Sequence, residues 1–545
     1  MKKILIACSI LIVLATGVFY YLKSKRLTDF EPLMKQKLQQ LVKDGSRGLY
    51  DISIGKVDID VLQSKVIFAD IHLHYDTSVY IQRVQLRQQP KDLFDIKVKA
   101  ISIDGITPVD ILRKKDLRLN VLYINNPVIK IYHTPGEDAF KDSTTLYHRI
   151  TKEIGSFGIK KFALKNANVS FVNTKTKVEE HFPELHITLD DFLIDDSTQN
   201  DSSRFLYSKD ASIAVMKYRR RTNDNLYTLK LDSVLIQASK KEVSIKKFQF
   251  TPNVSKAELR KILKARKDRY DIDINNIMIS NIDWWGVVTN DVVNIGDVLI
   301  KDGKAEIYCD KTIPVKQRNG ILYPHQKLFE LNMPFRIDKI KIKNLDFTYA
   351  EFNEESLKEG KIIFQNTDAV ITNITNIPSV IAKNPFLKID ATSSFMKTAA
   401  LNAGFTFNLA KQKEGVFSVY ANLGGLDGTL LNSVTEPLTM VKINKANITG
   451  YRMTMHGDIN DARADVLLTY HDLDITVLKK DDNGKMKKQG FMSFIVNTFK
   501  INGDAPKKGK APVTYEGNVV RRKQKTFFSL VWKTMLEGIK KTVGI

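Results

Sequence analysis

Four separated stretches of the chain repeat one short pattern, in which two runs of alternating apolar and polar residues flank an asparagine. They read VLYINNPVIKI (121–131), KFALKNANVSF (161–171), DIDINNIMISN (271–281) and KIKIKNLDFTY (339–349). Alternation places successive side chains on opposite faces of a β-strand, and asparagine is common in turns. The repeat therefore predicts strand–turn–strand units that build a sheet with one apolar face.

The spacing of these units predicts the kind of sheet. Their centres, Asn126, Asn166, Asn276 and Asn344, do not follow a fixed period, whereas propellers and strict solenoids do. Asp302-Gly303 is a further hairpin signal. We therefore expect a mainly β fold: an extended, curled antiparallel sheet that forms an apolar groove, with an N-terminal transmembrane helix and a few short flanking helices.

The N-terminus predicts a membrane anchor. Lys2 and Lys3 precede an uncharged apolar run from Ile4 to Leu22, which is long enough to cross about 30 Å of hydrocarbon. A cleaved signal peptide is the alternative, although the run is longer than a usual signal core. We expect residues 1–26 to form an uncleaved, single-pass anchor, with the bulk of the chain exported.

Two short helices are predicted beyond the anchor. The first is amphipathic, with Thr28 as its cap and Gly45 as its stop. It packs on a sheet edge, plugs the end of a groove, or does both. The second begins at Ser255, with Glu258 three residues later completing a capping box.

Charge and the C-terminal segment indicate a membrane or a protein partner. The formal net charge of +23 favours an acidic partner, and an exported chain meets a membrane surface rather than nucleic acid. Residues 521–545 are basic and predict an amphipathic helix. Its apolar side chains, expected to contact a membrane or partner, are Phe528, Val531, Trp532, Met535 and Ile539. The same helix could instead cover the end of the sheet.

The sequence carries no recognisable catalytic or metal-binding motif. It contains no P-loop, no nucleophile elbow and no glycine-rich dinucleotide turn. The nine histidines are scattered; His72 and His74 share one face of an expected strand, where such a pair is more often solvated than bound to metal. We expect no enzyme activity, no catalytic residues, no metal and no cofactor.

Several longer segments resemble the AsmA-like family of Gram-negative envelope proteins. They are YDISIGKVDIDVLQSKVIFADIHLHYD (50–76), the repeated units, GGLDGTLLNSV (424–434), NITGYRMTMHGDI (447–459), LLTYHDLDITVL (467–478) and KTFFSLVWKTMLEGIKKTVGI (525–545). The resemblance implies an inner-membrane protein with a periplasmic β-rich body, related in architecture to bridge-like lipid-transfer proteins. It divides the exported chain into a repeating β-groove region (27–390) and a C-terminal β region (391–520).

These observations together predict a membrane-anchored protein that binds phospholipid in its groove and supports lipid transport or envelope maintenance. The alternative is a non-enzymatic assembly or scaffold factor for outer-membrane proteins. Acyl chains would lie on alternating apolar residues of the groove floor. The expected floor residues are Val57, Ile59, Val61, Phe162, Leu164, Phe171, Ile340, Ile342 and Phe347.

Overall fold

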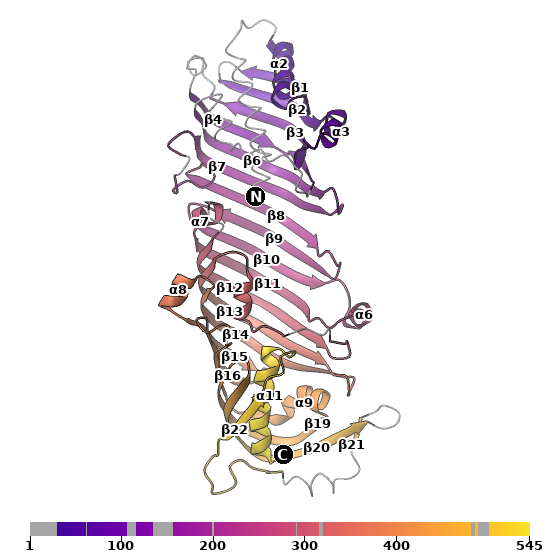
Figure 1. Ribbon diagram of the computed structural model, residues 1–545, viewed down its shortest axis with the longest axis vertical. Coiled ribbons are helices and arrows are strands. Elements are labelled where there is room, and N and C mark those ends of the chain that lie inside the picture. Colours follow the sequence, from indigo (N-terminus) through magenta and orange to yellow (C-terminus); the bar gives the residue numbers. More distant parts are fainter. Residues whose placement is uncertain are drawn as a thin grey trace. The chain divides into compact units, whose positions relative to one another are not determined.

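The computed structural model shows a mainly β protein built on a large mixed sheet, with a few short helices (Figure 1). It describes residues 30–60, 63–105, 116–134, 156–198, 201–289, 292–315, 320–480, 486–488 and 501–544. The predicted anchor, residues 1–26, lies outside these ranges. No helix within them is long and apolar enough to cross a membrane. The large sheet and the few short helices confirm the predicted mainly β class.

The chain divides into two compact units: unit 1 comprises residues 1–220 and 230–245, and unit 2 comprises 221–229 and 246–545. Unit 1 contains α2 (Phe30–Gly45), β1 (Tyr50–Asp60), β2 (Lys65–Tyr75), α3 (Thr77–Gln85), β3 (Asp92–Asp104), β4 (Asp116–Asn125), β5 (Val128–His133), β6 (Ser156–Asn173), β7 (Glu179–Ile194) and nearly all of β8 (Asp210–Arg221). The division falls within β9 (Tyr227–Gln237) and β10 (Glu242–Pro252). The predicted domain boundaries at residues 390 and 520 stay predictions.

Unit 2 contains the remaining elements. Its strands are β11 (Arg269–Ile282), β12 (Val293–Asp310), β13 (Phe335–Phe352), β14 (Glu359–Thr375), β15 (Phe386–Phe395), β16 (Ala399–Asn408), β17 (Phe417–Leu423), β18 (Leu426–Asp427), β19 (Val441–Gly457), β20 (Asp461–Lys480), β21 (Met486–Lys488) and β22 (Tyr515–Val520). Its helices are α6 (Lys256–Ile262), α7 (Trp284–Thr289), η1 (Gln326–Glu330), α8 (Pro378–Lys383), η2 (Gly428–Leu431), α9 (Asn432–Thr439) and α11 (Phe527–Val543).

Most strand pairs in the described ranges are antiparallel, as expected, but three of the described pairs are parallel. In unit 1 both β4 and β5 run parallel to β6, and in unit 2 β12 runs parallel to β13. A parallel pair needs a long connection, and the segments between these strands supply it. The expectation of an antiparallel sheet was therefore wrong at these pairs, and the sheet is mixed.

Helix α2 caps the edge strand of unit 1. The backbone N–H of Val57 donates to the Glu31 carboxylate at 3.1 Å, and the Lys35 ammonium donates to the carbonyl oxygen of Gly55 at 2.5 Å. These bonds satisfy polar groups of β1 that, among the described strands, its pairing with β2 leaves open. The predicted helix is confirmed, and it packs on a sheet edge. The capping box of Ser255 and Glu258 is also confirmed, at the start of α6.

Asparagine marks a kink within a continuing strand, not a chain reversal. Asn126, Asn166 and Asn344 have left-handed φ angles of 49°, 52° and 53°. Strands β6 and β13 continue through Asn166 and Asn344, and β4 and β5 keep one direction on either side of Asn126. The expected turns were therefore wrong. Asn276 and the expected hairpin at Asp302 likewise lie inside strands β11 and β12.

The left-handed residue keeps the apolar side chains on one face. In β13 the apolar positions are Ile340 and Ile342 before Asn344, and Leu345 and Phe347 after it, so the alternation changes phase at the asparagine. The register with β14 shifts at the same point. A bulge adds one residue to a strand. A shift of one residue moves side chains to the opposite face of a sheet. The bulge at Asn344 therefore places Leu345 and Phe347 on the same face as Ile340 and Ile342.

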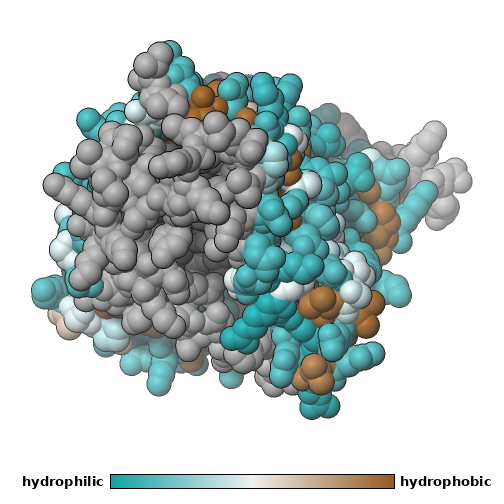
Figure 2. All heavy atoms as spheres, turned by 90° about the horizontal axis from the view of Figure 1, so that it is seen from above, coloured by the Kyte–Doolittle hydropathy of each residue, from teal (hydrophilic) through white to brown (hydrophobic). Residues whose placement is uncertain are grey.

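In unit 1 these aligned strands make a buried core. One row of cross-strand neighbours runs from β1 to β8 and consists of Val57, Phe68, Ile101, Ile124, Leu164, Ile187 and Ile213. None of these side chains is more than 7% exposed. Figure 2 shows that the described surface seen from one end of the molecule is mostly hydrophilic, with small separate apolar patches.

Candidate functional site

The apolar face of unit 2 is built from continuous rows of cross-strand neighbours. The first row runs from β11 to β20 and consists of Ile279, Val298, Ile340, Ile371, Ile389, Phe405, Val419, Met455 and Ala464. The second row lies two residues along each strand and consists of Ile277, Ile300, Ile342, Ala369, Ala391, Ala403, Ala421, Met453 and Val466. Every position in both rows is apolar.

A third, shorter row is aromatic. Phe347, Phe364 and Phe395 are cross-strand neighbours on β13, β14 and β15. The ring centroids of Phe347 and Phe364 lie 5.9 Å apart, and those of Phe364 and Phe395 lie 5.6 Å apart. Separations of this size are typical of favourable aromatic pairs. All three rings are half-buried, so they retain surface that a ligand could cover.

Burial changes along these rows. At the β19–β20 end, Met455, Ala464 and Val466 are completely buried, whereas Ile340 and Ile389 on β13 and β15 are only half-buried. The rows are equally apolar throughout, so the difference comes from what lies over them. We give the name apolar patch to six of the half-buried side chains, which lie on β13 to β16: Ile340, Ile342, Phe347, Ile371, Ile389 and Phe405.

Helix α11 covers the buried end. Figure 1 shows it crossing the strands near β16 and β22, and it packs on β20 and β22. A Cβ at Gly538 would lie 2.5 Å from Cγ2 of Val466, and one at Gly517 would overlap the carbonyl oxygen of Thr534. Only glycine allows helix and sheet to approach so closely. The α11 backbone therefore seals the rows where they reach β20.

The predicted residues of the C-terminal helix separate into two groups. Val531, Met535 and Ile539 pack against the core of unit 2, so the helix face that they define covers the sheet. Phe528 and Trp532 stay 61% and 39% exposed. Most of the helix therefore covers the sheet, which is one of the two alternatives that the sequence left open. The expected contact of Phe528 and Trp532 with a membrane or partner stays a prediction.

The predicted groove-floor residues likewise separate by unit. In unit 2, Ile340, Ile342 and Phe347 lie together on the apolar patch. In unit 1, Val57, Phe162 and Leu164 are 6%, 0% and 1% exposed; Ile59 and Phe171 are half-buried, and Val61 lies outside the described residues. Val57, Phe162 and Leu164 of unit 1 are therefore buried, whereas the predicted residues on the patch of unit 2 are only half-buried.

Sequence reasoning missed three members of the patch: Ile371, Ile389 and Phe405. Each lies in an alternating run, such as FTFNL at 405–409, which identifies the face but not its neighbours. Only the register Ile340–Ile371–Ile389–Phe405 brings them together.

The opposite face of the same strands is charged. Lys341 and Lys343 alternate with the patch residues of β13 and are exposed. The Lys343 ammonium lies 2.6 Å from the Asp368 carboxylate of β14. The sheet of unit 2 is therefore apolar on one face and polar on the other, as the alternation predicts.

A half-buried polar cluster ends the apolar face of β12 and β13. The Tyr349 hydroxyl donates to Glu351 at 2.8 Å, and Glu351 lies 3.1 Å from the Lys311 ammonium. Burial raises the pKa of the Cys309 thiol to about 11, and burial together with Glu351 raises the pKa of Tyr349. A thiol with a raised pKa is protonated at neutral pH and is a weak nucleophile. The cluster holds its charges in pairs.

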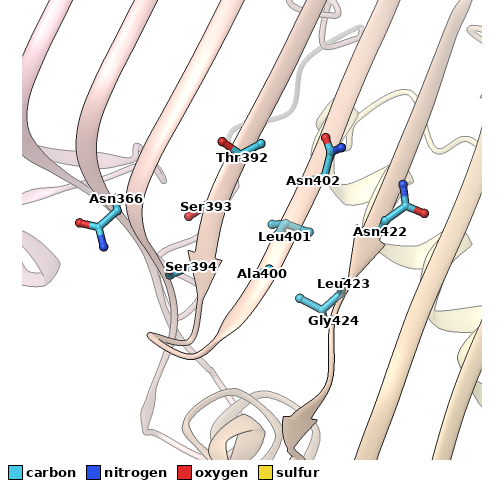
Figure 3. Close-up of a pocket in the computed structure, with 10 residues that line it drawn as sticks. All are labelled: Asn366, Thr392, Ser393, Ser394, Ala400, Leu401, Asn402, Asn422, Leu423 and Gly424. Carbon is cyan, nitrogen blue, oxygen red and sulfur yellow. The ribbon is translucent and has the colours of Figure 1, made fainter.

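A separate open pocket of about 530 Å³ lies over β14 to β17. Figure 3 shows its ten lining residues, among which Asn402 and Asn422 present amide groups and Thr392 a hydroxyl. None of the ten ionises near neutral pH, so the lining supplies hydrogen-bonding groups but no acid–base pair.

The expected histidine pair does not form a metal site with its neighbours. The ring centroids of His72 and His74 lie 4.9 Å apart, and His72 Nε2 lies 3.2 Å from the Asp95 carboxylate. Within the described residues no three His, Cys, Asp or Glu side chains gather as a metal site would require.

Comparison with known proteins leaves the family open. No protein-family model matches the chain, and a search of curated proteins finds no match.

Proposed function

We propose that the chain binds phospholipid acyl chains on the apolar patch of unit 2. The observation that carries this proposal is the change in burial along continuous apolar rows. Met455, Ala464 and Val466, at the end covered by α11, are completely buried. Most side chains of the rows on β13, β15 and β16 are half-buried, although Val298 and Ala369 are only 9% and 8% exposed. Apolar surface left accessible in this way favours an apolar ligand. Burial of an acyl chain contributes about 0.8 kcal/mol for each methylene.

The biological setting of this binding follows from the N-terminal segment and the family resemblance. An anchor at residues 1–26 would hold the protein in the inner membrane with its bulk in the periplasm. The segments that resemble AsmA-like proteins favour the same arrangement. In this setting the patch supports lipid transport or maintenance of the envelope, without catalysis and without a cofactor.

A second candidate is an assembly or scaffold factor for outer-membrane proteins. Strand β22 pairs with β20, and its terminal residue, Val520, is 78% exposed. A sheet edge of this kind can add a strand from a client protein. In that case the apolar patch would hold no lipid.

Native mass spectrometry of the gently purified, full-length chain tests the lipid proposal. The wild type is expected to carry phospholipid. Ile340→Asp and Ile342→Asp place a carboxylate on the patch and are expected to abolish loading, because a buried charge is strongly unfavourable. Lys341→Asp, between them on the opposite face, is the matched control and should load normally. Equal effects at all three positions would contradict a one-faced site.

Photo-crosslinking supplies a test that does not place a charge in the core. A benzophenone amino acid at Phe405 replaces one aromatic side chain with another on the patch. The same residue at Thr406 projects from the opposite face of β16. We expect phospholipid adducts at position 405 and none at 406. Adducts at neither position, from a protein that folds normally, would favour the scaffold function.

A further inference from the structure

Two aromatic side chains of α11 are exposed, although other apolar side chains of the same helix are buried against the sheet. Phe527 and Leu530 are 2% and 4% exposed and pack into the core of unit 2. Phe528 and Trp532 are 61% and 39% exposed and lie one helical turn apart. Four residues of spacing places two side chains on one stripe of a helix. The pair therefore forms a small apolar surface that the sheet does not use.

The chain around this pair is basic. Arg522, Lys523, Lys525 and Lys533 are exposed, and no acidic residue occurs from 521 to 536. Within the described part of the chain, the structure records no ion pair for these four cations. Arg521, by contrast, stacks on the Tyr323 ring at 4.2 Å and belongs to the core. The four cations are thus free to meet an anionic surface.

The aromatic pair also borders the apolar patch. The Phe528 ring lies 6.1 Å from that of Phe405, edge to face, and Phe405 is a member of the patch. The start of α11 therefore stands where the covered part of the apolar face gives way to the half-buried part. Any surface that contacts Phe528 would therefore also lie beside the apolar patch.

We propose that the start of α11 docks on an anionic phospholipid bilayer. Phe528 and Trp532 enter the interface, where aromatic side chains are favoured, and Arg522, Lys523, Lys525 and Lys533 contact the headgroups. The docking itself needs only this surface. Its use, to bring the patch within reach of bilayer lipid, rests on the proposed function.

Vesicle capture by the full-length chain tests the docking. The full-length chain is held in a surface-bound phosphatidylcholine nanodisc, so that the expected anchor at residues 1–26 is already occupied by lipid in every variant and α11 remains free. Fluorescent vesicles of phosphatidylcholine, with or without phosphatidylglycerol, are then passed over it. We expect capture of the anionic vesicles, little capture of phosphatidylcholine alone, and weaker capture at high salt.

Two sets of variants separate the aromatic and basic contributions. Phe528→Ser with Trp532→Ser should lower capture by at least about tenfold, since two apolar side chains lose their burial. Lys523→Gln with Lys525→Gln should lower it about fivefold for each charge removed. The control is Ile81→Ser with Leu86→Ser in unit 1, which removes side chains that are 52% and 59% exposed and should leave capture unchanged.

The outcomes distinguish this inference from the proposed function. Lipid loading is measured by mass spectrometry on the same variants, and retained loading also shows that they fold. Lost capture with retained loading supports the docking. Capture that ignores phosphatidylglycerol, or that survives the serine pair, overturns it even if the wild type carries lipid. A wild type that captures no vesicles overturns it too and leaves the aromatic pair to a protein partner.

Discussion

Two copies of the same pattern, KFALKNANVSF on β6 of unit 1 and KIKIKNLDFTY on β13 of unit 2, have different surroundings. Both continue through a left-handed asparagine and both align their apolar residues across neighbouring strands. Leu164 in the first copy is 1% exposed, whereas the equivalent Ile342 in the second is half-buried. The pattern therefore determines which residues share a face, and other contacts determine whether that face is sealed.

The largest expected effect comes from truncating the two equivalent residues. Leu164→Ala should reduce the free energy of unfolding of unit 1 by about 3–4 kcal/mol, as for a fully buried leucine. Ile342→Ala removes a side chain of equal volume that is partly exposed already, and should reduce that of unit 2 by about 1–2 kcal/mol. Hydrogen exchange of peptides from β6 and β13 reports each unit separately. Equal losses would break the comparison.

A buried histidine sets a pH dependence at the covered end of unit 2. The His325 side chain is buried: the residue is 1% exposed, its ring stacks on Phe407 at 4.8 Å, and neither ring nitrogen has a hydrogen-bond partner among the described residues. Burial lowers its pKa to about 4. As the pH falls from about 6.5 to 4, the unfolded chain binds a proton that the folded chain excludes, so stability falls. Above pH 6.5 its full contribution is present.

The expected size of this effect is about 3 kcal/mol between pH 6.5 and 4. His325→Phe keeps the ring and removes the titration. Stability measured by tryptophan fluorescence, since all three tryptophans lie in unit 2, should then decline less over this interval. An unchanged pH profile would show that the site opens to water.

Displacing α11 should convert the sealed end into surface of the half-buried kind. Gly517→Ala places a methyl group against the Thr534 carbonyl, and overpacking of this kind costs about 1–3 kcal/mol. Binding of an apolar dye should rise as Met453 and Val466 become accessible. Gly503→Ala, where a Cβ meets nothing within 4 Å, is the control. A variant that loses stability without gaining dye binding would show that α11 shifts without uncovering the rows.

The smallest expected effect concerns the left-handed asparagine that occurs in both units. Asn166→Ala and Asn344→Ala each force alanine into a left-handed conformation, at a cost of about 1–2 kcal/mol. The corresponding glycine variants should lose less, because glycine adopts this conformation freely. Thermal unfolding of the four variants checks this. A loss confined to one unit would show that the two kinks are not equivalent.

Several features of the fold could be predicted because their causes are local. Alternation assigned Ile340 and Ile342 to one face and Lys341 to the other, and the cap of α6 at Ser255 followed from its own side chain. The pattern alone predicts a turn at the asparagine, which is wrong, because a left-handed residue is common to turns and bulges. The change of phase that follows Asn344 is the local signal that favours a bulge.

Alternation is sufficient to predict a β-rich chain with one apolar face on each strand, because the direction of a side chain depends on its own backbone and repeats every two residues. The folded chain adds that β12 lies parallel to β13, that Ile340, Ile371 and Ile389 fall in one row, and that α11 seals one end of it. Pairing and coverage join residues far apart in the chain, so no short pattern encodes them. The apolar residues of the candidate site can be recognised in the sequence, but their proximity to one another and their exposure depend on the folded chain.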